Sequence, residues 1–293
     1  MTGLIPLTED IRDKKYRFTR RYGATALSNI PLEFDTDAGL TDPDQNQDNR
    51  PTECTAYSKT DMATDMTGKI YDPDYTYAMT LRVAGLPPET QGADLRMSFK
   101  SVIQYGLLEK KDAPDLSDKD QTFVADWKRW TAFVERALLN AQASYRWIYD
   151  DVYDHFDDIR SAMQTFFKAQ GIKQPVDWGI PWFYTFATKD ILTLADVKDL
   201  DLGSANWHDV NIKGWKQING EPYLVIKYWE KGRRKYFSRD LVNYLYSIRG
   251  TAAGMYDPTG NRTWSLFGFI VEQFPQILNI PNILSLFWNA SNP

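Results

Sequence analysis

The sequence contains one cysteine, Cys54, and two histidines, His155 and His208. A lone cysteine followed by a distant histidine is typical of a thiol nucleophile and its general base, and roughly 150 residues between them is a known spacing. Cys54 comes just before a predicted helix, whose positive N-terminal end favours the thiolate. His208 begins an apolar segment that is predicted to be a strand. These residues therefore predict thiol chemistry in a cleft between two structural units.

Other kinds of site are poorly supported. A single cysteine excludes an intramolecular disulfide and a cysteine-rich metal centre. His155 lies among aspartates, a composition that we interpret as a solvated acidic helix face rather than a metal site. We therefore expect no metal and no cofactor.

The composition is that of a folded, mildly acidic protein. The 293 residues include 34 Lys and Arg against 39 Asp and Glu, a formal net charge of −5, which argues against nucleic acid as the main partner. Apolar residues make up 43%. No segment has the ~18 consecutive apolar residues of a transmembrane helix, and the first residues lack the pattern of a signal peptide. We expect a cytoplasmic or virion-associated protein.

The first half of the chain is predicted to be helical. Apolar residues recur there at three- and four-residue steps, the spacing of one helix face. The expected helices are 55–66, 74–83, 93–105, 119–149 and 153–169.

The second half has the composition of strands, with many Val, Ile, Tyr, Phe and Trp residues. Asn219-Gly220 separates two such runs and predicts a hairpin turn. The expected strands are 176–186, 207–218, 223–229 and 235–237. Helices followed by strands predict an α+β protein with two lobes, a helical one at about 46–170 and one of strands at about 171–250.

Several segments, in the same order, resemble the papain family of cysteine peptidases. Cys54-Thr55-Ala56-Tyr57 is similar to the end of the family's "C-x-x-C-W-A-F/Y" segment. The run from His208 to Trp215 resembles "H-A-V-x-I-V-G-Y", and Tyr223 to Lys227 resembles "Y-W-I-V-K". The resemblance extends from residue 8 to about residue 247. It implies a two-lobed papain-like domain at 46–250, with an antiparallel, barrel-like sheet in the second lobe. Such a domain hydrolyses peptide bonds in a protein or peptide substrate without a cofactor.

The resemblance also implies roles for individual residues. Cys54 corresponds to the nucleophile and His208 to its general base. The oxyanion is expected to bind the Cys54 backbone N–H and a glutamine side chain. Gln47 is the nearest match to that glutamine, although it lies one residue too far from Cys54, and Gln45 is the alternative.

Two positions depart from the family pattern. Where the family has an asparagine that orients the histidine, this chain has Lys227 or Tyr228, and we take the Tyr228 hydroxyl as the replacement. Trp229 is expected to shield the site. Glu53 is expected to raise the pKa of the neighbouring thiol. These departures favour an alternative, a catalytically weak or inactive papain-fold protein in a larger assembly such as a phage virion.

The remaining segments form extensions. Residues 1–45 are predicted to be an irregular N-terminal extension, and residues 251–293 a hydrophobic C-terminal extension. The apolar segment 264–288 needs a partner surface. We expect it to pack on protein rather than on a membrane.

Overall fold

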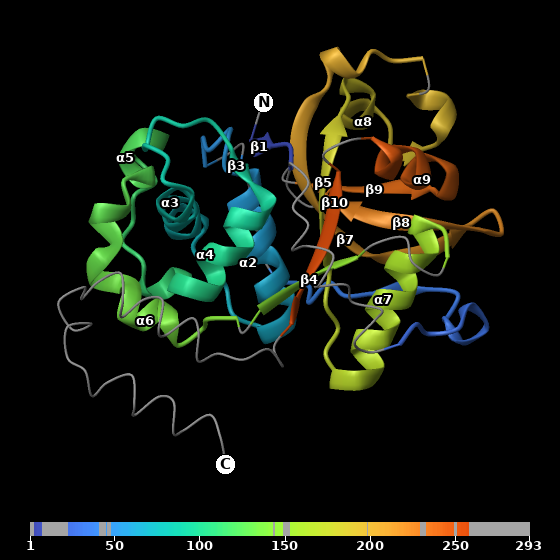
Figure 1. Ribbon diagram of the computed structural model, residues 1–293, viewed down its shortest axis with the longest axis horizontal. Helices are drawn as coiled ribbons and strands as arrows, with labels where there is room; N and C mark the ends of the chain where they lie inside the picture. The colour runs from blue at the N-terminus through green and yellow to red at the C-terminus, as the bar shows by residue number, and fades with distance from the viewer. Residues whose placement is uncertain are drawn as a thin grey trace, which may run out of the picture.

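The computed structural model describes residues 3–7, 23–40, 45, 48–142, 144–148, 153–197, 199–228, 233–248 and 251–257. These residues form two lobes that lie side by side (Figure 1). Helices from the first half of the chain make up one lobe, and a sheet flanked by helices makes up the other. The predicted α+β, two-lobed architecture is confirmed. The C-terminal segment 264–288 and residues 8–22 lie outside the described residues.

Three helices form the centre of the helical lobe: α2 (Cys54–Thr67), α3 (Pro73–Ala84) and α4 (Leu95–Tyr105). Asp72 caps α3 by accepting a hydrogen bond from the Tyr75 N–H, and Asp94 caps α4 in the same way. Left-handed glycines, Gly68 and Gly85, end α2 and α3. Because α2 packs against both α3 and the sheet, it is the helix shared by the two lobes.

The predicted long helix at 119–149 is wrong. The chain instead forms short elements: α5 (Gln121–Ala125), the 3-10 helix η4 (Trp127–Phe133), α6 (Val134–Leu138) and the strand β4 (Ser144–Ile148). The backbone of Asp126 is extended, and this residue ends α5 and caps η4. β4 pairs with a strand more than 100 residues away, which local periodicity does not reveal.

The described residues of the second lobe include an eight-stranded sheet, in which seven strands follow the order β4-β10-β5-β7-β8-β9-β6 and β2 pairs with β7. All pairings are antiparallel except β6 with β9. The remaining strands are β2 (Phe34–Asp35), β5 (Val176–Trp182), β6 (Ile191–Leu192), β7 (Asn206–Ile218), β8 (Glu221–Lys227), β9 (Arg234–Ser238) and β10 (Ala252–Asp257). The segment 251–293 thus contributes β10 to the sheet.

The long strand β7 turns into β8 at Asn219 and Gly220, which both have positive φ angles, 53° and 85°. This is the backbone of a tight hairpin turn, and it confirms the turn predicted from these two residues. Gly214 has φ 146° at a bulge in β7, where the backbone of β2 approaches so closely that a Cβ atom would overlap the Phe34 carbonyl. A glycine is therefore required at this position.

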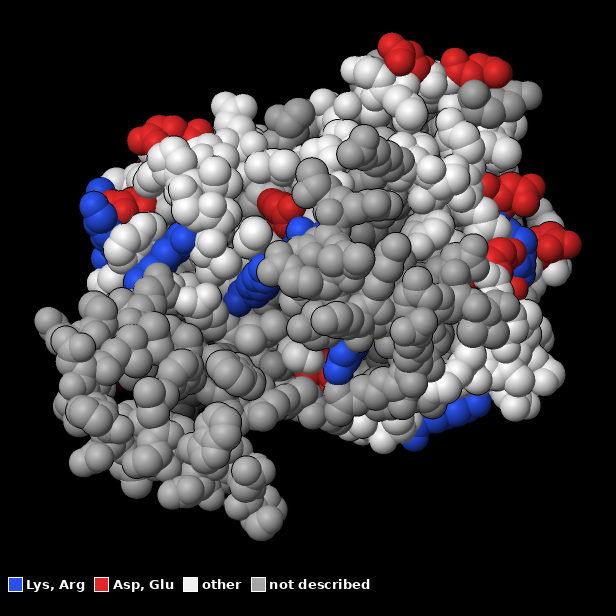
Figure 2. Space-filling model, in the orientation of Figure 1, with Lys and Arg blue, Asp and Glu red and all other residues white. Residues whose placement is uncertain are grey.

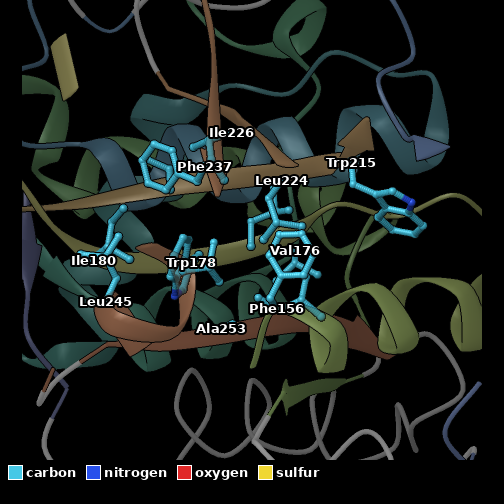
Figure 3. Close-up of a cluster of buried hydrophobic side chains, with 14 of the residues drawn as sticks. Phe156, Val176, Trp178, Ile180, Trp215, Leu224, Ile226, Phe237, Leu245 and Ala253 are labelled. Carbon is cyan, nitrogen blue, oxygen red and sulfur yellow. The ribbon is translucent and has the colours of Figure 1, made fainter. Parts of the chain in front are cut away.

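The hydrophobic core of the β lobe lies between the sheet and the helices α7 (His155–Gln170) and α9 (Arg239–Ser247). Figure 3 shows Val176, Trp178 and Ile180 of β5 facing side chains from both helices. Two short elements complete the description: α8 (Tyr184–Thr188) follows β5, and β1 (Leu4–Ile5) pairs in parallel with β3 (Ala93–Asp94). On the described part of the face drawn in Figure 2, charged side chains lie in small scattered groups, and several of these groups contain both acidic and basic residues.

Candidate active site

Cys54 is the first residue of α2 and is fully buried. At this position its backbone N–H has no partner within the helix and is available to a ligand. Burial raises the pKa of the thiol, and the negative charge of Asp209 raises it further. The Asp209 backbone N–H, which donates to the sulfur, and the Lys59 ammonium act in the opposite direction. Cys54 is thus in contact with strand β7 of the other lobe.

His208 lies in β7 directly before Asp209, paired in register with Ile180 of β5. The His208 side chain points to the opposite face of β7 from Asp209, the face on which its partner Ile180 enters the core of the β lobe. The His208 side chain is 7% exposed, and burial lowers its pKa to about 3. Helix α2, which carries Cys54, packs on β7, which carries His208, and the two side chains lie toward different faces of that strand.

An aromatic side chain of β5 covers the histidine. The Trp182 ring packs edge-on against His208, with 5.3 Å between ring centroids, and contacts the Tyr228 ring at 5.1 Å. Tyr228 is buried, and its ring and that of His208 both contact Trp182. Trp229, the expected shield, lies outside the described residues. The sequence does not predict Trp182 as a neighbour of His208, because this tryptophan ends a strand whose residues were assigned only to the core.

The two candidate glutamines differ in what the structure describes. Gln47 lies outside the described residues. Gln45 is buried, and its side-chain amide donates to the Arg50 carbonyl at 2.6 Å. Arg50 in turn forms an ion pair with Asp74 of α3, with 2.7 Å between Nε and Oδ1. Gln45 thus holds the turn that leads into α2.

Glu53 differs from its expected role. It is the N-cap residue of α2, yet its side chain makes no capping bond, and its carboxyl oxygens have no hydrogen-bond partner among the described residues. Burial and the nearby Asp74 carboxylate raise the pKa of Glu53 well above its usual value, so that the protonated form is favoured. Among the carboxyl groups, Asp209 has the largest effect in raising the pKa of the thiol.

The N-terminal residues 3–5 cover the cysteine. The Gly3 carbonyl accepts a hydrogen bond from the Ala93 N–H at 3.1 Å, and β1 continues this pairing along β3. A Cβ atom on Gly3 would lie 2.6 Å from the Cys54 sulfur. Leu4 is buried, with a side-chain carbon against Gly179 of β5.

Buried ion pairs join α2 to the sheet below the cysteine. Their members are Lys59, Asp61 and Asp65 of α2, Asp177 of β5, Asp209 and Lys213 of β7, and Lys227 of β8. Sequence analysis missed this cluster, although the polar residues at 209, 211 and 213 alternate as one face of a strand does. Such residues are normally assigned to the solvent.

The acidic segment around His155 is more buried than expected. Asp157 and Asp158 are buried, and Asp157 is paired with Arg160 and Arg239. His155 stacks on Tyr246 with 3.5 Å between ring centroids. Within the part of the chain that the structure describes, no group of three or more His, Cys, Asp or Glu residues could hold a metal ion. No described helix is both long and apolar enough to cross a membrane.

The fold has clear relatives among solved structures. Xylellain, a cysteine protease from Xylella fastidiosa, superposes with a TM-score of 0.64 at 15% sequence identity, over 88% of this chain and 96% of that chain. The chain has the papain-like cysteine protease fold. A digestive procathepsin L 3 from the larval midgut of Tenebrio molitor shares this fold, with a TM-score of 0.55 at 14% identity over 79% of this chain and 71% of that one. Neither a family model nor a curated protein sequence matches the chain.

Proposed function

We propose that this protein is a papain-like cysteine peptidase in which Cys54 is the nucleophile and His208 the general base. The observation that carries the proposal is the buried thiol of Cys54 at the N-terminus of α2, against Asp209 of β7, the residue next to His208. The packing of α2 on β7 supports a site whose nucleophile and base come from different lobes. The fold shared with xylellain supports the same reaction class.

In this proposal His208 takes the proton of the Cys54 thiol, and the thiolate attacks the carbonyl carbon of the scissile peptide bond. The carbonyl oxygen gains the negative charge and binds the Cys54 backbone N–H, with Gln47 as the second donor. His208 then donates its proton to the leaving amine, and a thioester remains. Water, deprotonated by His208, hydrolyses the thioester and frees Cys54. Tyr228 and Trp182 hold the imidazole during these steps.

The position of β1 suggests how a substrate binds and why the isolated chain is latent. An extended peptide can add to the edge of β3, as β1 does, since main-chain hydrogen bonds there are independent of sequence. Gly92 of this edge has φ 91°, and a Cβ atom there would lie 2.9 Å from the Gly3 carbonyl carbon. Residues 3–5 and a substrate therefore compete for the same edge.

The alternative is an inactive papain-fold protein that serves as a binding or structural component, for example in a phage virion. The complete burial of the thiol and the upward shift of its pKa favour this alternative. In that case the displacement of β1 would expose an unreactive thiol.

A cleavage assay on the full chain separates the two functions. Leu4→Asp places a charge against Gly179 and is expected to displace β1, whereas Ile5→Asp changes the exposed residue of the same strand and serves as the matched control. We expect quenched fluorescent peptides to be cleaved fastest by Leu4→Asp, and not at all when Cys54→Ser or His208→Ala is added. Absence of cleavage by both the wild type and Leu4→Asp would overturn the peptidase function and leave the structural role.

A further inference from the structure

Lys59 is the buried cation nearest to the cysteine along α2. Its ammonium group forms an ion pair with Asp177 of β5 and lies 3.3 Å from a carboxylate oxygen of Asp209. All three side chains are completely buried. The ammonium also lies 4.4 Å from the centre of the Phe99 ring, which closes the site from the helical lobe. Lys59 thus joins three elements at one point.

Asp209 connects this ion cluster to the thiol. Its carboxyl group contacts Lys59, while its backbone N–H donates to the Cys54 sulfur. A change at Lys59 therefore alters both the charge near the sulfur and the placement of the N–H donor. No other described residue of β7 combines a contact to Lys59 with a hydrogen bond to the thiol.

The charges of the cluster balance only when Lys59 is present. Two buried carboxyl groups, Asp177 and Asp209, hydrogen-bond to each other and face one ammonium. Burial and the neighbouring Asp177 raise the pKa of Asp209 well above its usual value, so that the two carboxyls share a proton. One carboxylate and one ammonium then leave the cluster close to neutral beneath Cys54.

We propose that Lys59 is a positioning residue of the cysteine site, because it offsets the charge of Asp177 and Asp209 and holds the Asp209 N–H against the sulfur. This inference rests on the proposed peptidase function but concerns a separate property, the ionisation of the thiol. Without Lys59 the pair retains uncompensated negative charge, which opposes a thiolate at short range.

Other titratable groups also face this region, and a test has to keep them constant. They are Glu53 at the start of α2, Tyr77 of α3, His208 of β7 and Tyr256 of β10, whose hydroxyl donates to the Lys59 carbonyl at 3.2 Å. The cationic form of His208 favours the thiolate, whereas the ionised forms of the other three oppose it. None of them is changed in the variants below.

Thiolate absorbance in the ultraviolet measures the ionisation of Cys54 directly, because the chain has one cysteine. The pH titration is made on the full chain, with Cys54→Ala as the blank that removes the tyrosine signal. We expect Lys59→Met to raise the midpoint by one pH unit or more, which lowers the thiolate fraction at neutral pH about tenfold. Adding Asp209→Asn to Lys59→Met is expected to restore most of that fraction.

Lys213→Met is the matched control. Lys213 is also completely buried and paired with two carboxylates, Asp61 and Asp65, but these lie further along α2. It should destabilise the fold without moving the thiol midpoint. Equal shifts for Lys59→Met and Lys213→Met, or no shift for Lys59→Met, would overturn the inference.

A further variant keeps the inference testable if Lys59→Met does not fold. Asp209→Asn alone leaves one carboxylate, Asp177, facing one ammonium, the same balance as in the wild type, so the thiol midpoint should stay near the wild-type value; a midpoint raised by one pH unit or more would overturn the inference. The titration needs no substrate, so a failure of the peptidase function is recognised separately, by a lack of cleavage in the assay above.

Discussion

The two faces of strand β7 are equally buried but chemically opposite. On one face Val210 and Ile212 enter the hydrophobic core of the β lobe, next to the β5 side chains seen in Figure 3. On the other face Asp209, Asn211 and Lys213 meet α2, and all three are completely buried. The strand thus has a hydrocarbon side that belongs to one lobe and an ionic side that joins the lobes.

The ionic face holds the two lobes in one arrangement at the candidate site. Hydrophobic contacts stabilise without fixing direction, whereas buried ion pairs and hydrogen bonds are costly unless their geometry is satisfied. Asn211 illustrates this constraint, because its amide donates to the Ser58 carbonyl at 3.1 Å and also to Asp61. We infer that the ionic face sets the register of α2 on β7, and therefore the place of Cys54 against Asp209.

The largest effect on stability is expected on the ionic face. Lys213→Met leaves the buried carboxylates of Asp61 and Asp65 without this partner, and breaking a buried ion pair in this way costs about 3–5 kcal/mol. Urea unfolding should show this decrease in the free energy of unfolding. A decrease below about 1 kcal/mol, the value of an exposed pair, would mean that the ionic face does not hold the lobes together.

An intermediate effect, dependent on pH, is expected on the hydrophobic side. Burial lowers the pKa of His155 to about 3, while its ring stacks on Tyr246. Because the unfolded chain binds this proton near pH 6.5, stability is complete above that pH and falls as the pH decreases toward about 3. The loss between neutral pH and pH 4.5 amounts to about 2–3 kcal/mol.

His155→Phe keeps an aromatic ring at this position and removes the titrating group. We expect thermal unfolding of the variant to depend less on pH below neutrality than that of the wild type. Part of the dependence should remain, because His208 has a similarly lowered pKa. The same pH dependence in both proteins would show that His155 is already accessible to protons in the folded state.

The smallest effect is expected within the hydrophobic face of β7 itself. Ile212→Val removes one methylene group from a fully buried side chain and should cost about 1 kcal/mol, without a change in the pH dependence. Chemical denaturation of Ile212→Val and Lys213→Met gives the loss in free energy of unfolding for each variant, so that the two faces of β7 can be compared directly. If the valine variant lost more than the methionine variant, the order of the two faces would be reversed.

Local patterns in the sequence were sufficient for much of the fold. The helical spacing of residues 55–66 and the Asn219-Gly220 turn both led to elements that the structure contains, because each depends on neighbours along the chain. The error at 119–149 has the opposite cause. β4 exists because it pairs with β10, and no local pattern encodes a partner over 100 residues away.

The candidate site divides in the same way. Cys54 and His208 were found from residue type, spacing and a family resemblance. The contact of Lys59 with Asp177 and Asp209 joins residues about 120 to 150 positions apart, and isolated lysines and aspartates are normally assigned to the surface. The cover over the thiol was likewise hidden, because Gly3 carries no side chain that would mark a contact.

The most direct test of the central claim is the rate at which Cys54 reacts with a peptide that carries a vinyl sulfone in place of the scissile bond. Intact mass measures the adduct on the full chain, in the Leu4→Asp background, where β1 no longer covers the thiol. The account predicts a single adduct at Cys54 and a rate about a hundredfold lower or more when His208→Ala is added. Equal rates with and without His208 would contradict a cysteine–histidine pair at this site.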